Sequence, residues 1–309
     1  MAQILVIKLG ALGDVVLAFA PFAAIRAHHP GDRVTLLTTA PFAGLCAASP
    51  WFDAVEIDAR PSWWNLRGIF ALRKRLRRFD FVYDLQTSGR SGRYHRLRGM
   101  RGWSGIARGA SHPHDNPGRD RMHTSARQAE QLACAGIAAV PLPDLSWLKS
   151  YGPVLQQPYA LLVPGAALHR PAKRWPANRF AEIAAILSAR GIRPVVVGSQ
   201  AEAALATPVL LACPGALDLT GRTSLLELGG LASRAVIAIG NDTGPMHLAA
   251  AVGTPAVVLF SRDSDPGLTA PVGPGPALVQ VLRADDLADL PVASVAAGIA
   301  TLLGPVNLN

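Results

Sequence analysis

Residues 236–260, VIAIGNDTGPMHLAAAVGTPAVVLF, constrain the fold more than any other part of the chain. The β-branched run Val236–Ile239 predicts a buried strand, Gly240–Pro245 a polar turn, and Met246–Val252 a short helix. The Gly-Thr-Pro sequence that follows ends this helix and leads into a second apolar strand, Ala256–Phe260. This strand–helix–strand unit predicts a parallel α/β sheet with helices on its faces.

The turn before that helix is a candidate phosphate site. The first amide groups of a helix lack partners within the helix, and the helix dipole favours an anion there. Thr243 adds a hydroxyl, and Gly244 lets a ligand approach the backbone closely. Asp242 can accept hydrogen bonds from sugar hydroxyls, and His247 can reach a phosphate. Instead of contacting a phosphate, His247 could pack in the core or cap the helix.

The same alternation of strands and helices runs through the whole chain, whose 309 residues are half hydrophobic and favour two α/β domains. The segment Ala138–Pro158, with four prolines, is the best linker, which predicts domains 1–154 and 155–309. The predicted strands are Ile4–Ile7, Val34–Thr38, Phe81–Leu85, Tyr159–Val163, Pro194–Val197, Val236–Ile239 and Ala256–Phe260. The predicted helices are Val15–Ala27, Leu66–Arg78, Ser125–Cys134, Ala177–Ala189, Glu202–Leu211, Leu225–Ala232, Met246–Val252 and Val292–Leu303.

Three segments resemble the heptosyltransferases, glycosyltransferase family 9. They are NDTGPMHLAAAVGTPAVVLF near the end, the N-terminal ILVIKLGALGDVVLAFAPFAAIR, and Lys173-Arg174-Trp175-Pro176 in the middle. The resemblance implies an α/β protein of two Rossmann-like domains facing a cleft, the GT-B fold, with acceptor binding in the first domain and nucleotide-sugar binding in the second. It also implies an inverting, metal-independent glycosyltransferase without a cofactor. Such an enzyme moves a heptose from an ADP-sugar donor to a lipopolysaccharide-core-type acceptor.

The resemblance also assigns roles to particular residues. Asp14 would be the general base for the acceptor hydroxyl, although its place equally suits a helix N-cap. Lys173 would offset the charge that develops on the leaving diphosphate, in a loop where Ala167, His169 and Pro171 stand near the position of the family's usual hydroxyl residue. Donor binding would involve Glu202 on the ribose, Asp242 on the sugar, and Thr243, Gly244 and His247 on the diphosphate, with Pro245 and Met246 in the same donor-binding run. Acceptor or phosphate binding would involve Lys8, Gly13, Arg73 and Arg77.

Several of these residues have structural alternatives. The alternative for Glu202 is a first-turn acid that the helix dipole favours, and the alternative for Lys8 is a lysine at the end of a strand whose ammonium reaches water. Trp175 is expected to pack at the start of the following helix. Two metal sites are not favoured: Asp263-Ser264-Asp265 suits a solvated turn, and the loose cluster of His112, His114, Asp115 and His123 lacks zinc-ligand spacing.

The formal charge of +9 is concentrated in the first half of the chain. Arginines and Lys74 crowd the predicted helix Leu66–Arg78, and more arginines follow from Arg90 to Arg108. Such a surface attracts an anionic partner, here an anionic glycolipid acceptor at the inner face of the inner membrane. The alternatives are a solvated basic face, a nucleic-acid-binding protein, and a non-catalytic nucleotide-sugar-binding relative. The glycosyltransferase hypothesis expects no nucleic acid, and the presence of Asp14 argues against the non-catalytic relative.

The three cysteines, Cys46, Cys134 and Cys213, are too few and too widely spaced for a disulfide framework or a zinc site. The first strand follows the N-terminus without a basic leader, and no apolar run reaches the length of a membrane span. These features predict a cytoplasmic protein.

Overall fold

The computed structural model describes residues 1–99, 101–166, 170–275 and 278–304. The chain forms two compact units that divide between Pro143 and Asp144, about ten residues before the predicted boundary at 154. The difference arises because the 3-10 helix Ser146–Ser150 packs on α9 (Leu225–Ala232) of the second unit. Arg234 adds to this attachment by donating to the carbonyl oxygens of Lys149 and Tyr151.

The first unit contains a six-stranded parallel sheet in the order β3-β2-β1-β4-β5-β6. Its strands are β1 (Gln3–Ile7), β2 (Arg33–Thr38), β3 (Ala54–Ile57), β4 (Phe81–Asp84), β5 (Trp103–Gly105) and β6 (His112–Pro113). The central strand β1 pairs with β2 and β4, so that Ile7 lies between Leu37 and Asp84. The three strands predicted for this half are present, and β3, β5 and β6 are additional.

Six α-helices lie among the described residues of the first unit: α1 (Leu12–Val16), α2 (Phe19–His28), α3 (Ala40–Ala47), α4 (Leu66–Leu76), α5 (Gly89–Arg98) and α6 (Thr124–Cys134). The prediction of one helix over 15–27 is wrong, because α1 and α2 are separate. Pro21 explains the break, since it has no amide hydrogen to donate to the carbonyl of Leu17. Helices α4 and α5 contact each other, and residues of both pack with β1, β2 and β4 in one apolar core.

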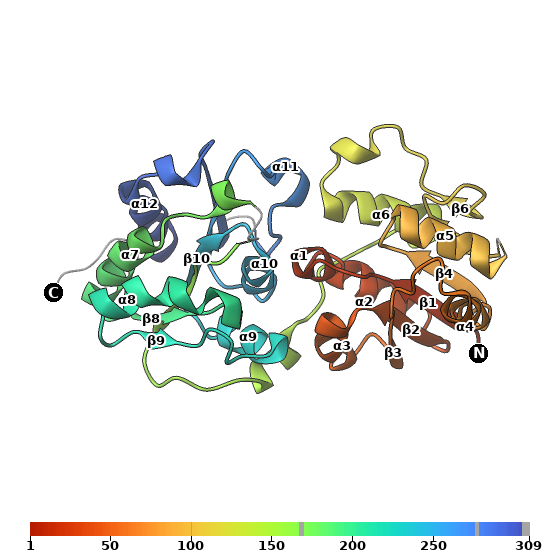
Figure 1. The fold of residues 1–309 in the computed structure, drawn as a ribbon, viewed down its shortest axis with the longest axis horizontal. Coiled ribbons are helices and arrows are strands. Elements are labelled where there is room, and N and C mark those ends of the chain that lie inside the picture. Colours follow the sequence, from red (N-terminus) through yellow and green to blue (C-terminus); the bar gives the residue numbers. More distant parts are fainter. Residues whose placement is uncertain (100, 167–169, 276–277, 305–309) are drawn as a thin grey trace. The chain divides into compact units, whose positions relative to one another are not determined.

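The second unit has a parallel sheet in the order β12-β11-β10-β7-β8-β9, which is the topology of the first sheet repeated. Figure 1 shows that each unit combines strands with helices. Its strands are β7 (Tyr159–Val163), β8 (Arg193–Val196), β9 (Leu217–Asp218), β10 (Ile237–Asn241), β11 (Ala256–Phe260) and β12 (Val279–Arg283). Helices α7 (Ala177–Ala189), α8 (Thr207–Ala212) and α12 (Val292–Leu303) share one core with β7, β10 and β11. Helices α9 and α10 (Gly244–Ala251) contact each other, and the short α11 spans Pro266–Thr269. Each unit therefore has the strand order of a Rossmann-like domain.

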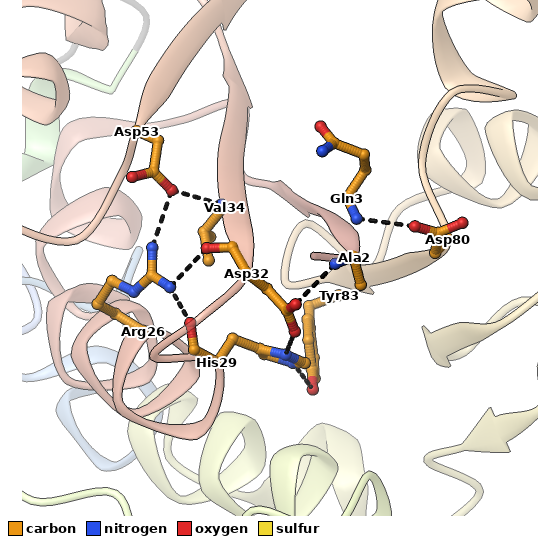
Figure 2. Close-up of polar contacts among 9 residues, drawn as sticks. All are labelled: Ala2, Gln3, Arg26, His29, Asp32, Val34, Asp53, Asp80 and Tyr83. Carbon is orange, nitrogen blue, oxygen red and sulfur yellow. Dashed lines mark hydrogen bonds and ion pairs between the residues drawn. The ribbon is translucent and has the colours of Figure 1, made fainter.

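A network of polar contacts fastens the amino ends of the first sheet, as Figure 2 shows. The amide of Ala2 donates to Asp32 Oδ1 at 2.7 Å, and His29 lies 3.0 Å from both Asp32 Oδ2 and the Tyr83 hydroxyl. These bonds lower the pKa of the Asp32 carboxyl, the amide of Ala2 contributing most. Because this edge is occupied by structural contacts, the candidate site residues of this unit are expected at the opposite, carboxyl ends of the strands.

Within the described part of the chain, no helix has the length and apolar character needed to cross a membrane.

Candidate functional site

A polar cavity of about 290 Å³ lies at the carboxyl ends of β1 and β4 in the first unit. It is lined by Lys8, Asp14, Leu85, Gln86, Thr87, Arg119, Asp120, Arg127 and Gln128. The two sequence-predicted residues Lys8 and Asp14 therefore share one cavity. Their neighbours Gln86 and Thr87 come from the turn after β4, Arg119 comes from the 3-10 helix Arg119–Arg121 before α6, and Arg127 comes from the first turn of α6.

Lys8 is buried in the wall of this cavity, with 4% of its surface exposed. Its ammonium donates to the carbonyl oxygen of Leu85 at 3.2 Å. Burial lowers the pKa of Lys8, and the nearby Asp14 carboxylate partly counteracts this effect. A cation held with so little water gains from an anionic ligand, so Lys8 fits a binding role better than that of a lysine reaching solvent.

Asp14 is half-buried in the first turn of α1, next to Gly13. Its Oδ2 atom accepts a hydrogen bond of 3.2 Å from the amide of Ala11, three residues earlier. The N-cap residue of α1 is Ala11 and Asp14 is the third residue of the helix, so the alternative that Asp14 is itself the N-cap is wrong; its carboxylate contacts the N-cap amide and also lines the cavity. The turn before it depends on Gly10, whose φ is +125° and where an added Cβ would lie 2.6 Å from the Phe42 ring.

Arg119 and Arg127 also line this cavity and were not predicted from the sequence. The Arg119 guanidinium donates to Thr87 Oγ1 at 2.9 Å and to His114 Nδ1 at 3.1 Å, which fixes it at the cavity. Both arginines lie about a hundred residues beyond Lys8, in a region where arginines are common, so only the fold shows that they belong to this site. With Lys8 they give the cavity three cations, which suits an anionic ligand.

Arg73 and Arg77 do not line the cavity that contains Asp14. Both are exposed, Arg73 in the last turn of α4 and Arg77 directly after its end. Arg73 lines a separate hollow of about 390 Å³ together with Trp63, Arg93, Arg96 and Leu97. The phosphate contact predicted for Arg73 and Arg77 would therefore lie on the surface of α4 and α5, and not in the cavity that contains Asp14.

The second unit has a cavity of about 330 Å³ at the carboxyl ends of β7, β8 and β10. Three predicted donor-binding residues line it: Glu202, Thr243 and Pro245. The other lining residues are Val163, Gly165, Gly198, Ser199, Thr223, Leu225 and Leu228. Residues far apart in sequence thus converge at the edge where open α/β sheets bind their ligands.

Glu202 is a first-turn acid, as its structural alternative expected, and it also lines the cavity. Its Oε2 atom accepts from the amide and the hydroxyl of Ser199, at 2.7 and 2.8 Å, which caps the 3-10 helix Gln200–Ala206. Its Oε1 atom lies over Gly165, where an added Cβ would be only 2.0 Å away. The cap therefore fixes one carboxylate oxygen and leaves the other beside the cavity.

Lys173, Asp242 and His247 form a compact charged cluster next to the start of α10. The Lys173 ammonium donates to Asp242 Oδ2 at 2.7 Å, and His247 Nε2 lies 3.8 Å from Asp242 Oδ1. Burial alone would raise the pKa of Asp242, but His247 and Lys173 outweigh it, so that the pKa is lowered. Asp242 is thus held as a carboxylate, and Lys173 is held in one place as a cation.

Asn241 is a third residue that was not predicted from the sequence. It is fully buried at the end of β10, where its side chain accepts from the amide of Trp175 at 3.1 Å and donates to the carbonyl of Pro164 at 2.8 Å. It therefore ties the strand end to the loop that carries Lys173. Trp175 packs in the core as expected, and its indole donates to the carbonyl of Leu290.

Helix α10 begins at Gly244, two residues before the predicted start, so the predicted turn over 240–245 is too long. The amides of Met246 and His247 donate to the Thr243 carbonyl, and Pro245 has no amide hydrogen. The helix start thus offers fewer donors to an anion than the sequence suggested. The Met246 side chain is fully buried against Gly240, and only its neighbours face the cavity.

The residues Ala167 to His169, where the sequence departs from the usual loop before Lys173, lie outside the described residues. Asp265 caps α11 by accepting from the amide of Gly267 at 2.8 Å, as expected for a turn. Across the described ranges, no group of three or more His, Cys, Asp or Glu side chains is placed to hold a metal ion.

Comparison with known proteins identifies the family. The model of glycosyltransferase family 9 (heptosyltransferase) matches residues 69–288. Lipooligosaccharide heptosyltransferase 2 of Haemophilus influenzae is 24% identical over 92% of this chain and 90% of the relative. The lipopolysaccharide core heptosyltransferase OpsX of the same organism is 23% identical over 86% and 80%.

Solved structures show the same fold. The E. coli heptosyltransferase WaaC with ADP has a TM-score of 0.82 at 21% identity, covering 97% of this chain and 99% of that one. E. coli ADP-heptose lps heptosyltransferase II has a TM-score of 0.78 at 22% identity, covering 97% and 98%. The two Rossmann-like domains of a GT-B protein are thus confirmed, and a glycosyltransferase is favoured over a nucleic-acid-binding protein and a non-catalytic relative. The chain belongs to glycosyltransferase family 9 (heptosyltransferase).

Proposed function

We propose that this glycosyltransferase is cytoplasmic and transfers heptose from ADP-heptose to a lipopolysaccharide-core-type acceptor, with inversion at the anomeric carbon. The relatives that match over most of the chain are lipooligosaccharide and lipopolysaccharide heptosyltransferases. The observation that carries the proposal is the Lys173–Asp242–His247 cluster beside the cavity lined by Glu202 and Thr243. This set supplies a fixed cation for a diphosphate and carboxylates for sugar hydroxyls.

The donor would bind in the second unit. Glu202 would accept from the ribose hydroxyls through Oε1, since Oε2 is occupied by Ser199. Lys173, Thr243, Gly244 and His247 would contact the diphosphate, and Asp242 would accept from the sugar. As the glycosidic bond breaks, negative charge develops on the leaving ADP, and a preplaced ammonium stabilises that charge in the transition state. In this mechanism Lys173 supplies the positive charge, and no metal ion or cofactor is required.

The acceptor would bind in the first unit, where Asp14 acts as general base. The acceptor hydroxyl oxygen forms the new bond to the anomeric carbon on the side opposite the departing ADP, and its proton passes to Asp14. A carboxylate suits this step because the hydroxyl becomes acidic only as the bond forms. The reaction requires the donor sugar to come within reach of Asp14.

The cations of the first cavity support an anionic acceptor. Lys8, Arg119 and Arg127 line it with Asp14, so a carboxylate or phosphate on the acceptor would be held close to the base. A lipid-linked acceptor would be met at the inner face of the inner membrane, which makes peripheral membrane contact part of the proposal.

The test is thermal unfolding with ADP, ADP-heptose and other nucleoside diphosphates, each with and without EDTA, followed by a transfer assay with ADP-heptose. A ligand at a hundred times its Kd should stabilise the native state by about 2.7 kcal/mol. We expect ADP and ADP-heptose to raise the Tm equally well in EDTA, and heptose to be transferred to a lipopolysaccharide core acceptor. Absence of any nucleotide effect, together with tight binding of nucleic acid, would contradict the proposal.

A further inference from the structure

The outer face of α4 exposes large apolar side chains that the core does not use. Trp64, which precedes the helix, is 92% exposed, and Leu66 and Phe70 are 78% and 68% exposed. The helix start is nevertheless ordered by a cap, since Asn65 Oδ1 accepts from the amide of Gly68 at 2.9 Å. A fixed helix therefore presents three large apolar groups to the outside.

The same face becomes basic toward the end of the helix. Leu66, Phe70, Arg73 and Arg77 follow the spacing of one helical face, and all four are exposed. The opposite face is held by Leu72 and Leu76, which are buried in the core of the first unit. The inner, apolar face of α4 therefore packs on the protein. The outer face is exposed, and it is apolar at the start of the helix and basic at its end.

Most cations on this outer face are not neutralised by the protein. Glu56 pairs with Arg78 at 2.7 Å and lies 3.5 Å from Arg75. By contrast, Arg67, Arg73, Lys74 and Arg77 have no ion-pair partner within the part of the chain that the structure describes.

Helix α5 extends the basic surface beside α4. Arg73 shares the hollow of about 390 Å³ with Arg93 and Arg96. The Arg93 guanidinium lies over the Trp63 ring, 4.9 Å from its centre, so this cation is held at the hollow. Several cations thus converge where a headgroup phosphate could be bound.

We propose that the outer face of α4 docks on an anionic phospholipid bilayer, with Trp64, Leu66 and Phe70 entering the interfacial region and Arg73, Lys74 and Arg77 contacting headgroup phosphates. A basic amphipathic helix with aromatic and leucine side chains lies in the membrane interface in this manner. A nucleic acid would stack its bases on aromatics beside the basic hollow, but Trp63, the aromatic there, is already covered by arginines, and the exposed Leu66 has no ring on which a base could stack. The inference rests on the proposed function in that a lipid-linked acceptor brings the enzyme to a membrane.

The test is sedimentation of the purified full-length protein with phosphatidylcholine vesicles, with and without phosphatidylglycerol. We expect binding only to the anionic vesicles and weakening by salt. The variant Arg73→Gln/Lys74→Gln/Arg77→Gln should lose affinity by on the order of 100-fold, because each surface cation contributes about five-fold. The variant Trp64→Ser/Phe70→Ser should lose about ten-fold or more, because it removes the apolar insertion.

Matched controls lie in the second unit. Arg283→Gln and Leu211→Ser also remove an exposed cation and an exposed apolar group, and they should change vesicle affinity less than two-fold. Quenching of tryptophan fluorescence by brominated lipid should fall in Trp64→Phe. Circular dichroism confirms that each variant is folded.

No vesicle binding, equal binding to neutral vesicles, or unchanged affinity in both α4 variants would overturn the proposal. Binding of nucleic acid that the α4 variants abolish, without vesicle binding, would also overturn it. Vesicle binding needs neither nucleotide nor acceptor, and transfer to a lipid-free core oligosaccharide should be unchanged in Trp64→Ser/Phe70→Ser, whose residues are not part of the proposed acceptor or donor site. Failure of docking is therefore distinguishable from failure of the proposed transferase function.

Discussion

Replacing Gly165 by alanine should weaken ADP binding by displacing Glu202. A Cβ at this position would lie 2.0 Å from Glu202 Oε1 and 2.4 Å from Cδ, far inside van der Waals contact. The backbone of Gly165 is outside the left-handed region, so alanine itself is not strained there. The carboxylate must therefore withdraw by more than about 1 Å to reach an ordinary contact distance.

The expected cost follows from the hydrogen bonds that this movement breaks. A hydrogen bond to a charged group contributes about 1.5 to 3 kcal/mol, so losing the proposed ribose contact should raise the Kd for ADP about 10- to 150-fold. Loss of the Ser199 cap should also lower the free energy of unfolding by about 1 kcal/mol. Isothermal titration calorimetry measures the first effect and urea unfolding the second.

A double-mutant cycle tests whether Gly165→Ala acts through Glu202. If Gly165→Ala acts only through Glu202, then Gly165→Ala/Glu202→Ala should bind ADP as Glu202→Ala alone does, because alanine at 202 removes the clash. Gly215→Ala is the matched control, since nothing lies within 4 Å of its added Cβ. An unchanged Kd in Gly165→Ala, or additive effects in the double variant, would refute this account of the ribose site.

Two further predictions concern buried charges. Lys173→Met should lower kcat about 10²- to 10³-fold, because it removes the cation proposed to stabilise the leaving ADP. Steady-state transfer assays measure kcat, and a wild-type value in Lys173→Met would contradict this role of Lys173. Burial raises the pKa of Asp84 to about 6, so the folded protein binds more protons than the unfolded one between about pH 4 and 6. Its contribution therefore makes the protein less stable as pH rises through that window, by about 3 kcal/mol. Asp84→Asn should remove this dependence of stability on pH. Urea unfolding at pH 4 and 7.5 measures it, and the variant should lose less free energy of unfolding between these pH values than the wild type does. If both proteins lost the same amount, Asp84 would not titrate as described.

The long, periodic elements could be predicted from the sequence because their patterns are local. The strands Tyr159–Val163 and Ala256–Phe260 and the helices Ala177–Ala189 and Leu225–Ala232 have the predicted bounds. Short strands such as β9, with two residues, carry no periodicity and are defined only by their neighbours. The start of α10 was misjudged because Gly-Pro suggests a turn, whereas proline is well tolerated in the first turn of a helix.

The candidate site was predictable where its residues follow a strand in a recognisable motif, as Asp14, Lys173 and Asp242 do. The polar partners that only the tertiary fold brings in were not. Arg119 and Arg127 reach the first cavity from a distant segment, and Asn241 appeared to belong to a turn although it ends a buried strand. Their roles depend on contacts between loops that are far apart in the sequence.

Heptose transfer by Asp14→Asn tests the central claim most directly. The side chain keeps its size but cannot accept a proton, so kcat for transfer from ADP-heptose should fall about 10²- to 10⁴-fold while the Kd for ADP is unchanged. Asp115→Asn, an exposed carboxylate of the same unit, should transfer at the wild-type rate. If Asp14→Asn also transferred heptose at the wild-type rate, Asp14 would not be the base and the proposed mechanism would be wrong.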